Sequence, residues 1–204
     1  MKKPSSFELP QKILKYSKEL GGIFSTTDLF NIINEKQPLT NKRRIQRLES
    51  AGILTRIKRG IYVTEDFDLW RLAAQIRPQC YISMFSILAT NGFTGTVPQN
   101  TVSVVCLGLQ KNLTVLNKQL NFYSIKKGLF FGFTSDSFGV CRADNEKAYL
   151  DVLYYYNRGY TFAIDPLTEI RTNKLNKKKV LKYLEKYKNP KFKEFVKGRL
   201  NAKL

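Results

Sequence analysis

The sequence contains no histidine, and this absence removes the most common general base and the most common metal ligand of proteins. Cysteine is scarce as well, with three residues at Cys80, Cys106 and Cys141. Their spacing matches no zinc or redox motif, and an odd number argues against a disulfide framework. Each lies in an apolar run, so we expect free, buried thiols and a reducing, cytoplasmic environment.

Long apolar runs are also missing, and none approaches the length that a membrane-spanning helix requires. The first residues, Met1 to Lys3, lead into polar residues and a proline, so no signal peptide is expected. The sequence therefore predicts a cytoplasmic protein with no membrane partner.

Motifs of enzymes are absent too. The Asp-x-Lys or Glu-x-Lys pattern of restriction-type nucleases does not occur, nor does a Gly-x-x-x-x-Gly-Lys-Ser/Thr phosphate loop. Asp66 and Asp68 are interpreted as helix caps. Glu146, Lys147 and Asp151 are interpreted as a structural ion-pair and capping cluster rather than a functional site. We therefore expect no enzyme activity, metal or cofactor, and a nucleic-acid-processing enzyme is the less favoured alternative.

Acidic residues are few: the sequence has 16 Asp and Glu and 35 Lys and Arg, which gives a formal net charge of +19. This excess goes beyond what solubility requires and indicates a polyanionic partner. Residues 1–64 carry 13 basic and 5 acidic side chains, residues 65–170 carry 9 of each, and residues 171–204 carry 13 and 2. A neutral middle between two cationic ends is the distribution expected for contact with nucleic acid.

A basic helix is predicted within residues 39–52. Thr40 is placed to cap it by accepting a hydrogen bond from an early backbone N–H. Ile45 and Leu48 give the helix a buried stripe, and Gly52 can end it in a left-handed conformation. Several basic residues lie in its first turns, where the helix dipole disfavours positive charge. Their presence there indicates that this end of the helix binds an anion.

A short hairpin is predicted directly after this helix. Residues 53–58 and 61–64 are expected to be strands, with Arg59-Gly60 as the turn between them. A basic helix followed by a basic-tipped hairpin is typical of a winged helix-turn-helix, whose recognition helix enters the major groove and whose wing touches the flanking backbone.

The predicted DNA-binding side chains lie on this helix and hairpin. Those early in the helix are assigned to base edges and phosphates, Arg47 to the backbone, and the hairpin cations to anchoring the wing. The full set is Thr40, Asn41, Lys42, Arg43, Arg44, Arg47, Arg56, Lys58 and Arg59. The alternatives are a solvated basic face or a winged helix that binds protein.

The sequence predicts an α+β fold in two domains, a winged helix-turn-helix at 1–64 and an α+β domain at 65–204. The second comprises a neutral core at 65–170, with a small, largely antiparallel sheet, and a basic helical tail at 171–204. The expected helices are 7–20, Ser25 or Thr26 to Pro38, 65–75, 81–91, Asp144 to near Gly159, 176–188 and 190–200. Besides the hairpin, the expected strands are 23–24, 101–107, 120–125, 129–134 and 138–142. The strand at 23–24 can pair with the wing.

The basic tail offers a second set of cations. Its helices place apolar residues on one stripe and lysines on the remaining faces. Additional phosphate contacts are predicted for Lys174, Lys177, Lys178, Lys179 and Lys182. A merely solvated pair of C-terminal helices is the alternative.

Three stretches together resemble the AbiEi-type abortive-infection antitoxins. The run Tyr81-Ile82-Ser83-Met84-Phe85-Ser86-Ile87-Leu88-Ala89-Thr90-Asn91-Gly92, followed by Val97-Pro98 and a strand, is similar to the middle of that family. The helix Ala143-Asp144-Asn145-Glu146-Lys147-Ala148-Tyr149-Leu150-Asp151-Val152-Leu153 looks like its "Glu-Lys-Ala-Leu-Leu-Asp" helix. The wing tip Arg59-Gly60-Ile61-Tyr62-Val63 is similar too.

The resemblance implies a regulator of a toxin–antitoxin pair. Such antitoxins repress a shared promoter by binding inverted repeats in double-stranded DNA through the winged helix. Their second domain is needed to counteract a nucleotidyltransferase-like toxin, without a stable complex with it. A stand-alone winged-helix regulator, or an interaction module that quenches a toxin with little DNA contact, are the alternatives.

Overall fold

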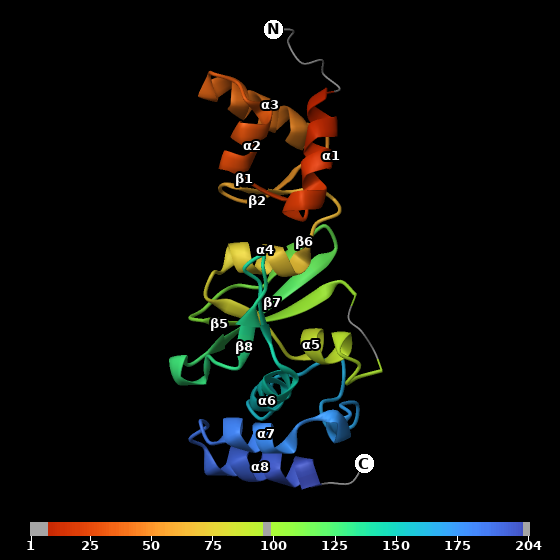
Figure 1. Ribbon diagram of the computed structural model, residues 1–204, viewed down its shortest axis with the longest axis vertical. Helices are drawn as coiled ribbons and strands as arrows, with labels where there is room; N and C mark the ends of the chain where they lie inside the picture. Colours follow the sequence, from red (N-terminus) through yellow and green to blue (C-terminus); the bar gives the residue numbers. More distant parts are fainter. Residues whose placement is uncertain (1–7, 96–98, 202–204) are drawn as a thin grey trace. The chain divides into compact units, whose positions relative to one another are not determined.

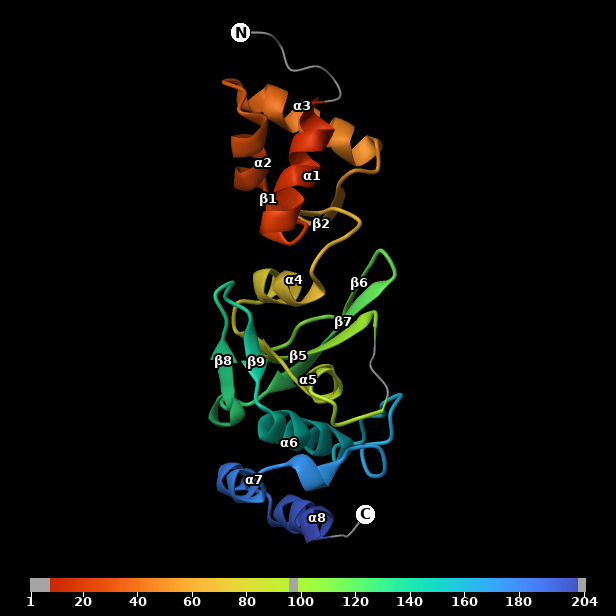
Figure 2. The same cartoon turned by 45° about the vertical axis from the view of Figure 1, so that its right-hand side comes forward.

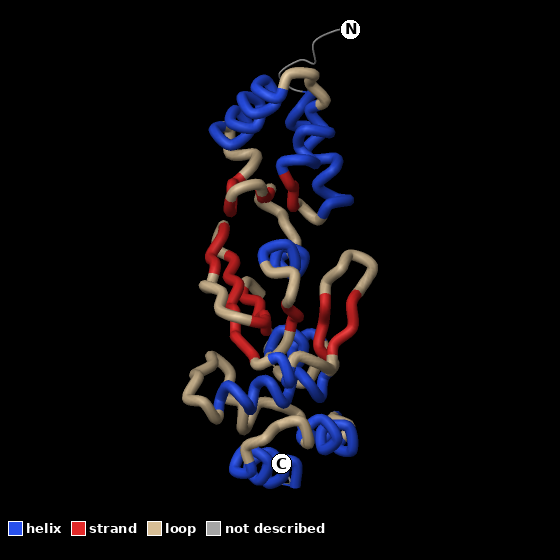
Figure 3. Tube along the Cα trace, turned by 90° about the vertical axis from the view of Figure 1, so that its left-hand side faces the viewer, coloured by secondary structure: helices blue, strands red, loops and turns tan. Residues whose placement is uncertain are grey.

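The computed structural model describes residues 8–95 and 99–201. Phe7, at the start of the first expected helix, and Val97-Pro98 lie outside these residues. The chain forms two compact units, Met1–Leu72 and Ala73–Leu204, each of which combines helices with strands (Figure 3). The expected division after residue 64 falls inside the first unit.

The first unit packs three helices against a small antiparallel sheet with the order β1-β3-β2 (Figure 1). Its core contains Ile13, Phe24, Leu29, Ile45 and Leu48. The elements follow the expected order, and the predicted pairing of Ile23-Phe24 with the hairpin is confirmed. They are α1 (Glu8–Leu20), β1 (Ile23–Ser25), α2 (Thr26–Ile33), α3 (Pro38–Ser50), β2 (Thr55–Lys58) and β3 (Ile61–Val63).

Helix α2 begins with a capping box. Ser25 Oγ accepts a hydrogen bond from Asp28 N at 3.1 Å, and Asp28 Oδ2 accepts one from Ser25 N at 2.8 Å. These two bonds satisfy backbone donors that a helix start leaves unpaired. Of the two residues expected at the start of this helix, Ser25 and Thr26, Ser25 is therefore the cap.

The predicted boundary between α2 and α3 is wrong at two points. Helix α2 ends at Asn34 in a left-handed conformation, and Pro38 is the first residue of α3 rather than the end of α2. Proline suits this first position because it lacks the N–H that would be unpaired there. Thr40 consequently lies inside the first turn, and Gln37 takes the cap position without a side-chain hydrogen bond.

Glycine allows two sharp turns around α3 and the hairpin. Gly52, directly after the helix, has φ +71°, and Gly60, in the hairpin turn, has φ +84°. Both were assigned these roles from sequence, and both predictions are confirmed. The hairpin also contains an irregularity between Arg56 and Lys58, where the register of β2 against β3 shifts by one residue.

Gly22 is expected to tolerate a side chain far less well than Gly52. Both residues have φ near +70°, where a Cβ costs about 1–2 kcal/mol. At Gly22 a Cβ would also lie 2.5 Å from Asp66 O and 2.7 Å from Phe67 Cα, whereas at Gly52 nothing lies within 4 Å. In urea titrations, Gly22→Ala should therefore lower the unfolding midpoint clearly more than Gly52→Ala. Equal midpoints would contradict the packing around Gly22.

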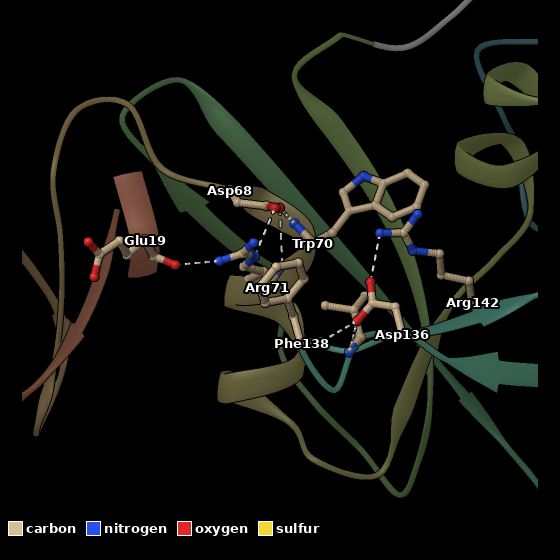
Figure 4. Close-up of polar contacts among 8 residues, drawn as sticks. Glu19, Asp68, Trp70, Arg71, Asp136, Phe138 and Arg142 are labelled. Atoms are coloured by element: carbon tan, nitrogen blue, oxygen red, sulfur yellow. Dashed lines mark hydrogen bonds and ion pairs between the residues drawn. The ribbon is translucent and has the colours of Figure 1, made fainter. Parts of the chain in front are cut away.

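Asp68 caps the next helix, α4 (Leu69–Ile76), as expected for one of the two candidate carboxylates. Its Oδ1 accepts hydrogen bonds from the backbone N–H of Trp70 at 2.8 Å and of Arg71 at 3.1 Å. Arg71 pairs with Asp68 and donates from Nη1 to Glu19 O at 3.1 Å (Figure 4). This contact ties the end of α1 to the start of α4.

The second unit contains a six-stranded sheet with the order β6-β7-β5-β4-β9-β8. The pairs β4–β5, β6–β7 and β8–β9 are antiparallel, whereas β5–β7 and β4–β9 are parallel. The α+β class is confirmed, but the largely antiparallel sheet is not, because the sheet is mixed. The elements are β4 (Cys80–Ile82), α5 (Phe85–Thr90), β5 (Thr101–Leu107), β6 (Leu113–Val115), β7 (Lys118–Ile125), η1 (Lys127–Leu129), β8 (Phe133–Ser135), β9 (Cys141–Ala143), α6 (Asn145–Tyr156), η2 (Thr172–Lys174), α7 (Lys177–Leu184) and α8 (Pro190–Asn201).

The parallel pairing of β5 with β7 follows from the short strand β6. Leu116 and Asn117, between β6 and β7, have φ +46° and +64°, the backbone of a tight hairpin turn. Strand β6 therefore reverses the chain before β7, and β7 runs parallel to β5 along seven register pairs. A three-residue strand with no glycine in its turn carries little sequence signal.

Two expected elements are corrected. The helix expected over 81–91 begins as strand β4 and becomes helix only at Phe85, after Met84 at φ +53°. Strand β4 lies between β5 and β9 and is buried on both faces, so its residues show no alternation that would reveal a strand. The strand expected over 129–134 is instead the end of η1 followed by β8.

Helix α6 lies at the centre of the second unit, between the sheet and the α7–α8 pair (Figures 1 and 2). Every residue from Glu146 to Leu153 is buried. Asp144 caps it, with Oδ1 accepting from Lys147 N at 2.8 Å, which confirms the predicted cap. The β8–β9 turn leading to it is fixed by Asp136, which pairs with Arg142 at 2.8 Å (Figure 4).

Candidate nucleic-acid interface

Helix α3 presents three cations to solvent. Ile45 and Leu48 turn inward to the core, as predicted, and this orientation leaves Lys42, Arg43 and Arg47 exposed. Exposed guanidinium and ammonium groups are the side chains that contact phosphates and guanine edges in a major groove. Three of the residues assigned to the helix therefore lie outside the core and are accessible to a ligand.

Asn41 does not fit its predicted role as a base-contacting residue. Its side chain is only 4% exposed, and Nδ2 donates a hydrogen bond to Glu35 O at 3.1 Å. An amide held this way stabilises the turn between α2 and α3. Asn41 is buried because it lies four residues before Ile45 and seven before Leu48, on the same inward stripe of the helix. Thr40, also in the first turn, is half-buried.

Arg44 is held by an ion pair within the first unit. Its Nη2 donates to Glu35 Oε1, and its side chain is only 21% exposed. A DNA phosphate would have to compete with this carboxylate, so Arg44 is better placed to position the start of α3 than to read a base. Glu35 was not anticipated from sequence, although it is the single carboxylate between Asp28 and Glu49.

The hairpin carries three exposed cations, Arg56, Lys58 and Arg59, as the sequence predicts for a wing. Arg56 and Lys58 lie on β2, and Arg59 precedes Gly60 in the turn. On β3, the side chain of Ile61 is half-buried and that of Tyr62 is buried within the first unit. The cations of α3 and of the hairpin thus belong to one compact unit.

The five lysines of the predicted second cationic surface differ in their environments. Lys177, Lys178 and Lys182 are exposed on α7. Lys174 Nζ donates to Gly92 O at 3.1 Å. Lys179 Nζ lies 3.2 Å from Asp144 Oδ2 and 3.0 Å from Glu146 Oε2, so its charge is already matched by two carboxylates.

The contact with Lys179 lowers the pKa of the Glu146 carboxyl. Burial acts to raise the pKa of this carboxyl, but the hydrogen bonds from Lys179 and from Asn176 N together hold the pKa below its usual value. A carboxyl with a lowered pKa stabilises the fold above its unfolded pKa, and this contribution disappears as pH falls through the folded pKa.

Lys179→Met is therefore expected to reduce stability, whereas Lys182→Met should not. The loss at Lys179 should be largest near neutral pH and should shrink toward zero in acid, because Glu146 is then protonated in both states. Thermal melts of both variants between neutral and acidic pH measure this. A pH-independent difference between the variants would contradict the assigned pairing.

A buried charged pair, Lys147–Asp151, lies on α6 in the second unit. Both side chains are fully buried, and Lys147 Nζ donates to Asp151 Oδ1. Asp151 Oδ2 also accepts from Tyr81 Oη at 3.0 Å and Ser83 Oγ at 2.8 Å. Lys147 Nζ further donates to Tyr187 Oη at 3.3 Å. The pair thus joins β4, α6 and the segment after α7.

Burial dominates the protonation of this pair. It raises the pKa of Asp151 and lowers the pKa of Lys147, because each charged form loses its hydration, and the mutual ion pair opposes both changes. The hydrogen bonds described above satisfy the two groups, and neither is exposed to a ligand. The geometry agrees with the interpretation of Lys147 and Asp151 as a structural ion pair.

The three cysteines, all among the described residues, form no disulfide. Cys80 and Cys106 are buried, as expected, whereas Cys141 is half-buried. Burial raises the pKa of Cys80 to about 12 and raises that of Cys106, so both thiols are protonated and poorly nucleophilic at neutral pH.

Comparison with solved structures finds a similar fold. No family model and no curated protein matches the sequence. Among solved structures, the chain is similar to the crystal structure of the RV2827C protein from Mycobacterium tuberculosis, with a TM-score of 0.57 and 8% sequence identity. The match covers 96% of this chain and 83% of that chain. At this identity, the similarity describes the fold alone.

Within 8–95 and 99–201, no group of three or more Cys, Asp and Glu side chains is gathered as a metal ion would require. None of the helices in the same ranges has the length and apolarity needed to cross a membrane.

Proposed function

We propose that the protein is a cytoplasmic, sequence-specific DNA-binding regulator whose first unit is a winged helix-turn-helix. The observation that carries the proposal is the exposed trio on α3, Lys42, Arg43 and Arg47, in the same unit as a hairpin with three more exposed cations. Side chains of a recognition helix read base edges and phosphates, and wing cations contact the flanking backbone. The net charge of +19 supports a nucleic-acid partner.

The roles within this surface follow from exposure. Lys42 and Arg43 are assigned to base edges and phosphates and Arg47 to the phosphate backbone, and all three are exposed on α3. Arg56, Lys58 and Arg59 anchor the wing. Arg44 and Asn41 support the start of α3 through Glu35. The exposed lysines of α7 add sequence-independent phosphate contacts.

We further propose that the regulator is an antitoxin of the AbiEi type. It represses the promoter of its own operon through inverted repeats and counteracts a nucleotidyltransferase-like toxin without forming a stable complex with it. The support is the resemblance of three sequence stretches to that family, one of which includes the capped and largely buried helix α6. No enzymatic step, metal or cofactor is part of the proposal.

Gel shifts on the DNA upstream of the gene test the DNA-binding role. Binding should be at least about tenfold tighter to this DNA than to a scrambled duplex at the same salt concentration. Equal affinity for both at every salt concentration would refute sequence-specific regulation.

Co-expression with the neighbouring gene product tests the antitoxin role separately. If that neighbour is nucleotidyltransferase-like, the full chain should restore growth to cells expressing it. Operator binding without rescue would leave a stand-alone regulator, and rescue without operator binding would indicate an interaction module.

A further inference from the structure

The second unit contains a cavity of about 580 Å³. Small-molecule sites range over roughly 300–1,000 Å³, so the cavity has the size of such a site. Three segments contribute its lining residues, one around η1, one at the end of α6 and just after it, and one from the loop after α7 into the start of α8. The lining residues are Lys126, Gly128, Leu129, Tyr154, Asn157, Arg158, Lys186, Tyr187, Lys188, Asn189 and Phe192. These segments are far apart in sequence, and neither α3 nor the hairpin contributes to the wall.

The described wall of this cavity is strongly cationic. Lys126, Arg158, Lys186 and Lys188 line it, and no carboxylate does. Asp151, the buried acid of α6, is already matched by Lys147. A concave surface with charge of one sign concentrates the field and attracts small anions. The ligand is therefore expected to carry negative charge.

Aromatic rings form the floor of the cavity. Tyr154 packs against Tyr187 and Phe192 with ring centroids 5.7 Å and 5.9 Å away. Tyr187 and Phe192 are each only 2% exposed, whereas Tyr154 is partly exposed. A ligand that used only the cations would leave the exposed part of the Tyr154 ring uncovered, so an aromatic portion is expected as well.

Arg158 gives the floor a stacking surface. Its guanidinium carbon lies 5.3 Å from the centroid of the Tyr154 ring, and Nη1 donates to Tyr154 Oη at 3.1 Å. Guanidinium planes and aromatic rings are the two kinds of surface on which nucleobases stack in proteins. Asn157 and Asn189 add amide groups at the wall, which can donate to and accept from a base edge.

Lys186 is positioned by an aromatic ring of the neighbouring segment. Its Nζ lies 3.9 Å from the centroid of the Phe131 ring, a cation–π contact that limits where the ammonium can go. With Lys126 and Lys188 it supplies three ammonium groups for one ligand. Lysine ammonium groups bind phosphate as compact point charges.

We propose that this cavity binds a nucleoside phosphate, with the base stacked on Tyr154 and Arg158 and the phosphates held by Lys126, Lys186 and Lys188. The same chemistry is offered by a free nucleotide and by the phosphorylated end of a single strand. This site is separate from the DNA-binding surface proposed for the first unit, and it does not depend on that function.

Titration calorimetry on the full chain tests the site. The probes are ADP, GDP, CDP and UDP. Pyrophosphate, which has the phosphates but no base, and adenosine, which has base and sugar but no phosphate, are the controls. At least one nucleoside diphosphate should bind about tenfold or more tightly than either control, because only it uses both cations and rings. Absence of binding by all four at millimolar concentration, or pyrophosphate binding as tightly as the best of them, would overturn the proposal.

Variants of exposed wall residues place the binding in this cavity. Lys186→Gln and Arg158→Gln should each weaken the best nucleotide by about tenfold, the loss of one charge-assisted contact. Lys197→Gln removes the same charge from α8 but does not line the cavity, and it should bind nucleotide as the unaltered protein does. Equal weakening by Lys197→Gln and Lys186→Gln would refute the assignment.

Short oligonucleotides decide between the two sources of the ligand. A 5′-phosphorylated trinucleotide that binds more tightly than the mononucleotides supports a strand end, and the reverse order supports a free nucleotide. Gel shifts on operator DNA with and without the best nucleotide keep this result apart from the DNA-binding proposal, since either can fail while the other holds.

Discussion

Asp151→Ala is expected to destabilise the protein by about 3–5 kcal/mol, because it leaves the buried Lys147 ammonium without its counter-charge. It also removes the acceptor of the hydroxyl groups of Tyr81 and Ser83. Against a total stability of about 5–15 kcal/mol for a typical domain, this is a large fraction. Urea or thermal unfolding monitored by circular dichroism measures the loss.

A double variant separates the charge from the rest of the cluster. Lys147→Met with Asp151→Asn removes both charges but keeps an amide oxygen for Tyr81 and Ser83. It should be clearly more stable than Asp151→Ala, since breaking one side of a buried pair costs more than removing both charges. If the double variant is the less stable of the two, the pair is not what holds this region together.

The combined variant Lys42→Ala, Arg43→Ala and Arg47→Ala is expected to lower operator affinity by about a hundredfold or more. Each side chain contributes about 1–3 kcal/mol if it reaches a base and less if it reaches a phosphate, and about 1.4 kcal/mol is a factor of ten. The slope of log affinity against log salt concentration should also become shallower, by about 0.9 for each phosphate that these side chains no longer neutralise.

The matched control for this prediction lies on α1 of the same unit. Lys12, Lys15 and Lys18 are partly or fully exposed there, and replacing all three by alanine removes the same net charge. Gel shifts and salt titrations on both triple variants should show a much larger decrease in affinity for the α3 variant. A similar decrease for both would mean that overall charge, rather than the α3 surface, determines binding.

Local signals in the sequence predicted the local features of the fold. The start of α2 was placed at Ser25 or Thr26 and that of α6 at Asp144, and Gly52 and Gly60 were assigned to turns, because each acts through its immediate neighbours in the chain. The inward stripe of α3 was likewise predicted, since it depends only on helical spacing. Exposure of the α3 cations followed from that stripe.

Features set by distant contacts were missed. Strand β4 was predicted as helix because its neighbours β5 and β9, which bury both of its faces, are not visible in its own residues. The cavity between η1, α6 and α8 escaped prediction because three separate segments build its wall.

Tyr187 has a consequence for how this protein can be synthesised and dissected. Its hydroxyl completes the shell around Lys147, which lies 40 positions earlier in the chain, and its ring belongs to the floor of the cavity. A ribosome-bound chain cannot close its second core until the residues up to Tyr187 and beyond have been translated. Deleting the lysine-rich helices to probe their charge would thus remove part of a core, and charge-neutralising substitutions are the appropriate tool.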